Sequence, residues 1–99
     1  MGQRLQLHEL LETIADNVYF QPPPNIQIEY PCIIYHRDYA NTDFADNNPY
    51  TFTLRYMVTV IDRDPDSDIP GKVALLPMCI FNRFYTADSL NHDVFRLFF

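Results

Sequence analysis

The chain has 99 residues, of which 47% are apolar and 15% aromatic, a composition typical of a globular protein with one core. We therefore treat residues 1–99 as a single domain. Thirteen acidic and seven basic residues give a net charge of −6, the wrong sign for a DNA-binding groove. No apolar run approaches the ~18 residues of a membrane span, and no basic-then-apolar leader is visible, so we expect a soluble protein that is not exported by the usual route.

The first third of the chain predicts one helix and two strands. Residues 4–17 place leucine and isoleucine side chains at helical spacing, so we expect an amphipathic helix that ends near Asn17. The aromatic stretch 18–21 is expected to form a short strand, and the prolines at 22–24 to hold the chain extended after it. Residues 32–39 (CIIYHRDY) are rich in β-branched and aromatic side chains and predict a second strand.

The clearest pattern in the chain is the strict alternation of residues 50–62. We expect the even-numbered side chains to face the core, and these are Phe52, Leu54, Tyr56, Val58 and Val60. This strand and the strand at 32–39 are expected to form a long hairpin, with residues 38–50 as its arm or loop.

The segment 38–50 carries three acidic and three aromatic residues and no basic residue. The acidic residues are Asp38, Asp43 and Asp46. The aromatic residues are Tyr39, Phe44 and Tyr50, and nothing in the local sequence would bury them. A connection of this length is longer than an ordinary hairpin loop and is often functional. We therefore expect the aromatic residues to contact a neighbouring subunit or a partner.

A second acidic stretch, residues 61–68 (IDRDPDSD), is a candidate metal site. A calcium loop that begins at Asp62 needs glycine at its sixth position and glutamate at its twelfth, but Ser67 and Val73 stand there. The register that begins at Asp64 fails in the same way. A nuclease-type site would need a lysine or histidine spaced to join the carboxylates, and Lys72 is not so placed. We therefore expect no metal site.

A helix start is the simplest interpretation of the same stretch. Asp66, Ser67 or Asp68 can cap a helix that runs to Pro77, and negative charge is favourable at that end. A cap uses one or two aspartates, so Asp62 and Asp64 are surplus, and we expect them to need a partner or a place where repulsion is useful.

The sequence shows no catalytic pattern. His92 and Asp93 are adjacent, and adjacent side chains in a strand point to opposite faces, which argues against a base and its orienting carboxylate. Two glycines cannot build a phosphate-binding loop. Cys32 and Cys79 stand alone and are expected to be reduced core thiols. We expect neither an enzyme nor a cofactor, and a small cation-binding or metal-dependent module remains the alternative class.

The last 21 residues predict two strands around a turn at residues 86–92. In the first strand Phe81, Arg83 and Tyr85 are expected on one face and Phe84 on the other, so both faces carry aromatic side chains. Two explanations remain open: helices cover both faces of the sheet, or one face is buried in an assembly. In the second case Phe84 and Phe98 are candidate interface residues.

Several stretches resemble the tail terminator proteins of long-tailed bacteriophages, which are also described as minor capsid or head–tail connector proteins. These stretches are NVYFQPP, YPCIIY, ADN, TVIDRDPDSDIPGKVALLP and FYTADSLNHDVF, and residues 58–93 are the most specific part. The resemblance implies an α+β fold with a mostly antiparallel sheet of four to five strands, an N-terminal helix and a second short helix. It also implies a homohexameric ring that caps the head-proximal end of the tail tube.

The same resemblance implies the partners and the location of the chain. The ring would contact the tail tube protein and the head stopper or connector protein, in a virion assembled in the bacterial cytoplasm. DNA would pass through its lumen without specific binding. Asp43, Asp46, Asp62 and Asp64 would then either line that lumen, where they repel phosphates, or meet basic patches on a partner. A head-completion or stopper protein of the neck is the alternative role.

Overall fold

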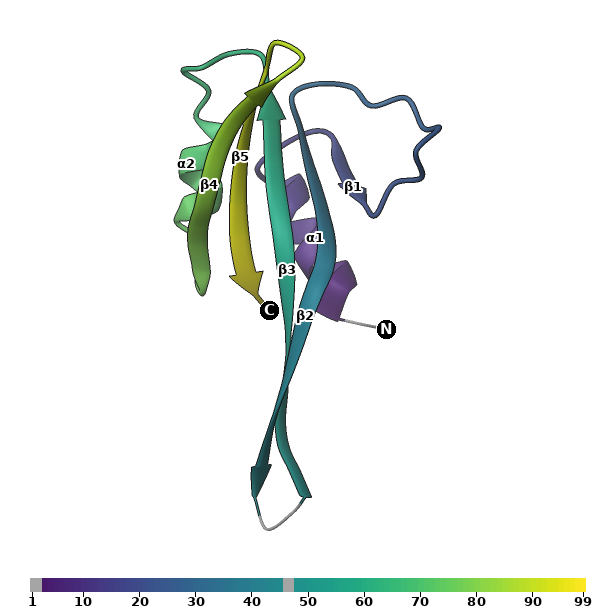
Figure 1. Cartoon of the computed structure of the whole chain (residues 1–99), viewed down its shortest axis with the longest axis vertical. Helices are drawn as coiled ribbons and strands as arrows, with labels where there is room; N and C mark the ends of the chain where they lie inside the picture. The colour runs from purple at the N-terminus through teal and green to yellow at the C-terminus, as the bar shows by residue number, and fades with distance from the viewer. Residues whose placement is uncertain (1–2, 46–47) are drawn as a thin grey trace.

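The computed structural model describes residues 3–45 and 48–99, and the side chains of residues 4–39 and 54–99. Within these residues the chain forms a five-stranded sheet in the order β1-β2-β3-β5-β4 (Figure 1). The strands are β1 (Val18–Phe20), β2 (Cys32–Ala45), β3 (Asn48–Asp62), β4 (Cys79–Ala87) and β5 (Leu90–Phe98). The helices are α1 (Gln3–Glu12) and α2 (Ile69–Ala74). Only β1 and β2 pair in parallel, so the predicted α+β fold with a mostly antiparallel sheet is confirmed.

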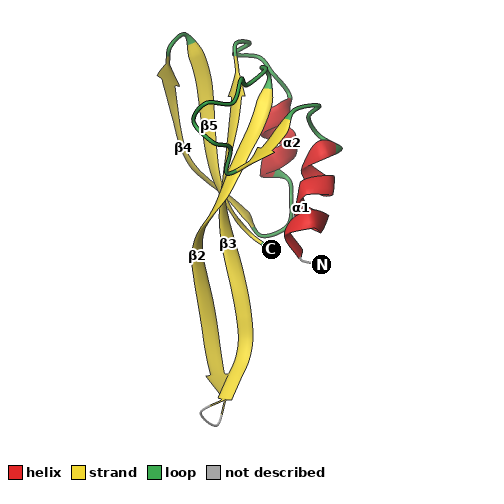
Figure 2. Cartoon of the chain, turned by 90° about the vertical axis from the view of Figure 1, so that its right-hand side faces the viewer, coloured by secondary structure: helices red, strands yellow, loops and turns green. Residues whose placement is uncertain are grey.

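The hairpin of β2 and β3 extends well beyond the other strands. β1 pairs with β2 only at residues 33–35, and β5 pairs with β3 only from Arg55 onward. Residues 41–45 and 48–53, which we call the arm, therefore project from the sheet as two strands paired with each other (Figure 2). The arm accounts for the extents of 51 × 26 × 23 Å and for a radius of gyration of 14.8 Å, against ~13 Å for a compact chain of this size.

The prediction of a loop at residues 38–50 is wrong for the part of this segment that the structure describes. The ladder of β2 and β3 continues to the pair Ala45–Asn48. The Asp- and Asn-rich composition suggested a loop, but a ladder is made by backbone groups, and the threonines and aromatic residues of 50–53 favour a strand. The alternative of an arm, also drawn from the sequence, is confirmed.

Both described helices pack on the same face of the sheet, which we call the helix face (Figure 2). Leu7 and Leu11 of α1 and Val73 of α2 are fully buried there. α1 ends at Glu12, before the predicted end near Asn17, because Thr13, Ile14 and Ala15 follow it in tight turns. The same helix-face core includes Phe95 and Leu97 of β5.

The predicted core face of β3 is confirmed for its described side chains. Tyr56, Val58 and Val60 are buried on the helix face, and Leu54 packs against them half-buried. The side chain of Phe52 lies outside the described residues. A period of two thus identified the buried face correctly.

The opposite face, which we call the open face, has a smaller cluster at one end. Cys32, Ile61 and Leu90 are buried there beneath Ile28 and Tyr30 of the connection between β1 and β2. The explanation that helices cover both faces of the sheet is therefore wrong. Both described helices lie on the helix face, and a loop covers only part of the open face.

The β4–β5 hairpin turns at Asp88 and Ser89, which both have positive φ angles of 53° and 63°. The turn lies within the predicted range of residues 86–92. The register shifts between Phe81 and Arg83, so one residue of β4 is unpaired and the alternation of side chains reverses. Phe81 lies opposite Phe95 of the helix face, whereas Arg83 lies opposite Val94 of the open face. The prediction that Phe81, Arg83 and Tyr85 share a face is therefore wrong.

Candidate functional site

The aspartates of residues 62–68 order their own loop. The Oδ1 atom of Asp62 accepts a hydrogen bond from the backbone N–H of Asp64 at 2.9 Å, and the Oδ1 atom of Asp64 accepts one from Asp66 at 2.9 Å. These are Asx turns, which shape the connection between β3 and α2. Asp62 and Asp64 therefore have a local structural role that the sequence analysis missed.

Of the three predicted capping residues of α2, Asp66, Ser67 and Asp68, it is Ser67 whose side chain accepts from the start of the helix. Asp68 stands at the N-cap position but makes no side-chain cap, whereas Ser67 Oγ accepts a hydrogen bond from the N–H of Ile69 at 3.3 Å. α2 has six residues and ends at Ala74, before the predicted end at Pro77. Asp68 instead pairs with Lys72 one turn later, at 3.5 Å. Among the described residues, no three His, Cys, Asp or Glu side chains are grouped so that they could hold a metal ion.

His92 and Asp93 are separated by the sheet. The His92 ring stacks on Tyr85 with centroids 4.5 Å apart, on the open face, and its Nδ1 atom lies 3.2 Å from the carbonyl oxygen of Leu90. Burial raises the pKa of Asp93, and the nearby His92 acts in the opposite direction. This arrangement holds two strands together and does not form a base with its orienting carboxylate.

The exposed large apolar side chains of the described residues gather along β4, on both faces of the strand: Ile80 and Tyr85 lie on the open face, and Phe81 and Phe84 on the helix face. Nine large apolar side chains are exposed among those described, and six of them lie between the end of α2 and the end of β4. These six, which we call the β4 surface, are Leu75, Met78, Ile80, Phe81, Phe84 and Tyr85. Their exposure runs from 38% at Tyr85 to 86% at Leu75. Clustered apolar exposure of this kind marks an interaction site rather than ordinary surface.

β4 is also an edge strand. Within the described residues it pairs with β5 alone, so its outer backbone groups face away from the sheet (Figure 1). A long apolar edge strand is a template for pairing with another chain, unless charge, proline or a covering element protects it. The single bulge and the single charged residue of β4, Arg83, give it little protection.

The open face beside β4 carries basic side chains. Arg55 of β3, Arg83 of β4 and Arg96 of β5 lie on this face by the register of the strands, with His36 of β2. Asp38 of the first acidic stretch pairs with Arg55 here. The other acidic residues lie elsewhere: residues 62–68 follow the end of β3, and Asp43 belongs to the arm at the opposite end of the hairpin (Figure 1). A chain with a net negative charge thus has two exposed arginines, Arg83 and Arg96, side by side on the open face.

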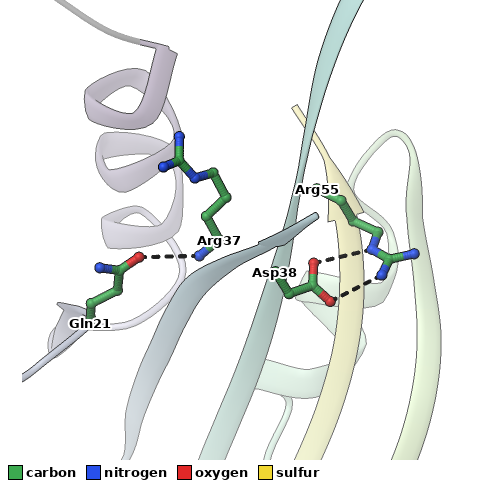
Figure 3. A network of polar contacts seen from close by, with 4 residues as sticks. All are labelled: Gln21, Arg37, Asp38 and Arg55. Carbon is green, nitrogen blue, oxygen red and sulfur yellow. Dashed lines mark hydrogen bonds and ion pairs between the residues drawn. The ribbon is translucent and has the colours of Figure 1, made fainter. Parts of the chain in front are cut away.

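The base of the arm is fixed by a polar cluster (Figure 3). Arg55 donates to Asp38 through Nε at 3.1 Å and through Nη2 at 3.3 Å, and its guanidinium lies 4.7 Å from the ring centre of Tyr39. On β2, next to Asp38, the backbone N–H of Arg37 donates to Gln21 Oε1 at 3.4 Å. The arm is therefore tied to the sheet at its base.

The predicted interface residues are divided among three places. Tyr39 and Phe98 lie on either side of Arg55 on the open face, at the base of the arm. Phe84 is 53% exposed and belongs to the β4 surface. Phe44 and Tyr50 are on the arm, with Asp43. Their side chains lie outside the described residues, as does the whole of Asp46.

Most of the β4 surface was missed by sequence reasoning. The two-sided aromatic pattern of residues 80–85 pointed to an interface, but nothing in the sequence analysis singled out Leu75 or Met78. Their exposure follows from the edge position of β4, which is set by pairing between distant parts of the chain.

Neither described helix, with ten and six residues, is long and apolar enough to cross a membrane. A scan against protein-family models and searches of curated proteins and of solved structures found no match to this chain.

Proposed function

We propose that the chain is a structural component of the neck of a long-tailed bacteriophage, a tail terminator that forms a homohexameric ring at the head-proximal end of the tail tube. The ring ends polymerisation of the tube and presents a surface to the head stopper or connector protein. The resemblance of the sequence suggests this role. The observation that carries it is the β4 surface, because an assembling subunit needs an apolar contact area that its own fold leaves uncovered.

The energetics of the β4 surface support a role in assembly. Full burial of a leucine, isoleucine, methionine or phenylalanine side chain is worth about 1.5–3 kcal/mol. The six side chains of this surface are well exposed in the isolated chain, so a partner that covers them gains a large part of this free energy. Aromatic residues and methionine are also the types enriched in interface cores. A solvent-facing role would leave this surface as an aggregation hazard.

The distribution of charge supports a ring through which DNA passes. Six copies of a chain with a net charge of −6 carry a large negative charge, and the acidic stretch 62–68 projects at one end of the sheet. Carboxylates repel phosphates over a Debye length of ~8–10 Å. DNA therefore slides past such a lumen without adhering to it.

The test combines a mass measurement with assembly on tail tubes. Native mass spectrometry of the purified chain is expected to give a hexamer, either alone or after addition of tail tubes. Electron micrographs with a gold-labelled chain are expected to show the label at the head-proximal end of each tube. A label on the head connector of tailless heads would instead indicate the stopper role, and a monomer that never associates with tubes or heads would overturn the proposal.

A further inference from the structure

We propose that the arm of one copy of the chain docks on the β4 surface of the next copy, so that each subunit gives one arm and receives one. This inference rests on the proposed ring and names the two surfaces that join its subunits.

A closed ring requires two different surfaces on every subunit. In a cyclic assembly of more than two copies, the contact is head-to-tail, so one patch of a subunit meets another patch of its neighbour. The arm and the β4 surface are separate on the chain. The arm projects from the end of the sheet near Arg55, and the β4 surface follows its edge strand (Figure 1). The two features therefore suit opposite sides of a repeated contact.

The arm lacks the support that a hairpin needs. In the described part of the chain, residues 41–45 and 48–53 pair only with each other. A two-stranded hairpin is at best marginally stable in water without a third strand or a packed face. A strand and an apolar surface from a second copy supply both.

The lengths of the two features agree. Six residues of β3 in the arm, 48–53, span ~20 Å at 3.3 Å per residue. The nine residues of β4 span ~30 Å on the same basis. The whole arm strand thus fits along β4, where the outer backbone groups of an edge strand and the six exposed apolar side chains are available.

The charges of the two features are opposite. Residues 40–50 contain Asp43 and Asp46 and no basic residue. The only charged residue of β4 is Arg83, and Arg96 is exposed beside it on the open face of β5, whereas Asp93 of β5 lies on the helix face, opposite Phe84. Complementary charge of this kind guides the encounter and fixes its register, while the apolar side chains supply the affinity. Arg83 and Arg96 would repel a basic partner at this site.

Cysteine cross-linking between two chains tests the contact directly. In a Cys79→Ser background, one chain carries Thr51→Cys on the arm and the other carries Phe84→Cys on β4. Wild-type oligomers are first confirmed by native mass spectrometry, and the mixed chains are then treated with a short bismaleimide. Cross-linked dimers are expected in the mixture and not with either chain alone. A chain that carries both cysteines is expected to give a ladder that ends at the ring.

The matched control replaces Phe84→Cys by Ile26→Cys, which is also exposed but lies in the connection between β1 and β2. A second pair, Thr53→Cys with Ile80→Cys, repeats the test should either first variant fail to fold. Rings that cross-link equally well through Ile26→Cys, or that do not cross-link through β4 with either pair, overturn this interface and leave the ring intact. A wild-type chain that remains monomeric and binds no tube overturns the proposed function, and this interface with it.

Discussion

Arg55 and Asp38 form a two-point ion pair across the β2–β3 hairpin, at the place where the arm leaves the sheet. The two contacts are 3.1 and 3.3 Å long, and both side chains are largely buried. Asp38 is the residue at which the register of β2 shifts, between the pairs of Arg37 and Tyr39. A bulge turns a side chain out of the normal alternation. Here the bulge brings the carboxylate of Asp38 to the guanidinium of Arg55. A regular strand would place that carboxylate elsewhere.

Arg55→Ala is therefore expected to destabilise the chain and to loosen the arm. A hydrogen bond to a charged group contributes ~1.5–3 kcal/mol, and the substitution also leaves Asp38 partly buried and unpaired. We expect urea denaturation to show a loss of ~1–3 kcal/mol and hydrogen exchange to accelerate in residues 38–45. Arg63→Ala is the control, since this side chain is exposed and lies 5.6 Å from the centre of the Tyr30 ring, away from the arm. An equal effect of the two substitutions would show that the ion pair does not fix the arm.

A pair of leucines on α1 tests the assignment of the helix face. Leu11 is fully buried in the core, whereas Leu5 is 40% exposed on the same helix. Leu11→Ala is expected to lower the free energy of unfolding by ~2–5 kcal/mol, through lost burial and the cavity that remains. Leu5→Ala is expected to cost well under ~1 kcal/mol because its surroundings are already solvent. Chemical denaturation measures both, and similar losses would mean that α1 packs through another face.

The fold was predictable from sequence where a pattern is local and repeats. The alternation of β3 identified Tyr56, Val58 and Val60 as core, because a strand with one buried face allows only one register for its apolar side chains. The Asp- and Asn-rich arm was harder, because strand propensity depends on what pairs with the strand. The pairing of Thr51 and Phe52 with Asp43 and Thr42 on β2 decided it.

The candidate site was less predictable, because it depends on long-range pairing. β5 lies between β3 and β4 in the sheet, and this insertion leaves β4 at the edge with its apolar side chains exposed. The bulge near Asn82 reverses the alternation of β4, which no periodicity in residues 79–87 signals. Phe84 was identified because a strand with aromatic residues on both faces needs something to cover its second face. No such pattern marks Leu75 or Met78.

Ser89→Gly is expected to stabilise the chain. Asp88 and Ser89 both adopt positive φ in the two-residue turn, a conformation that costs an ordinary L-residue ~1–2 kcal/mol and glycine almost nothing. Part of this gain is offset because glycine has more freedom in the unfolded chain. We expect a net gain of ~0.5–1 kcal/mol, measured by thermal melting. Thr86→Gly, in the adjacent strand, should destabilise instead, and a loss for both substitutions would contradict the turn geometry.

Asp93→Asn is expected to have an effect that depends on pH. Burial raises the pKa of Asp93, so the folded state holds its proton more tightly than the unfolded state. This contribution to stability is present below the unfolded pKa and is lost as the pH rises through the folded value. The amide cannot ionise, so we expect a higher melting temperature than wild type at pH 7 and an equal one at pH 3. A variant that is less stable than wild type at pH 7 would show that the carboxylate has a stabilising partner.

The two thiols are expected to differ in reactivity, and Cys79 is expected to report on assembly. Cys32 is fully buried, and burial together with the charge of Asp62 raises its pKa to about 12, so it should react with a disulfide reagent at pH 8 only after unfolding. Cys79 begins β4 and is half-buried, and burial raises its pKa as well, so its reaction in the monomer should be slow but measurable.

Docking of a neighbour on β4 should protect Cys79 and leave Cys32 unchanged. We expect the rate of Cys79 modification to fall as the protein concentration rises through the range in which oligomers form. The Cys79→Ser variant supplies the baseline for Cys32, and addition of denaturant supplies the full thiol count. A rate for Cys79 that is independent of concentration, in a sample shown to contain rings, would place the contact between subunits away from this end of β4.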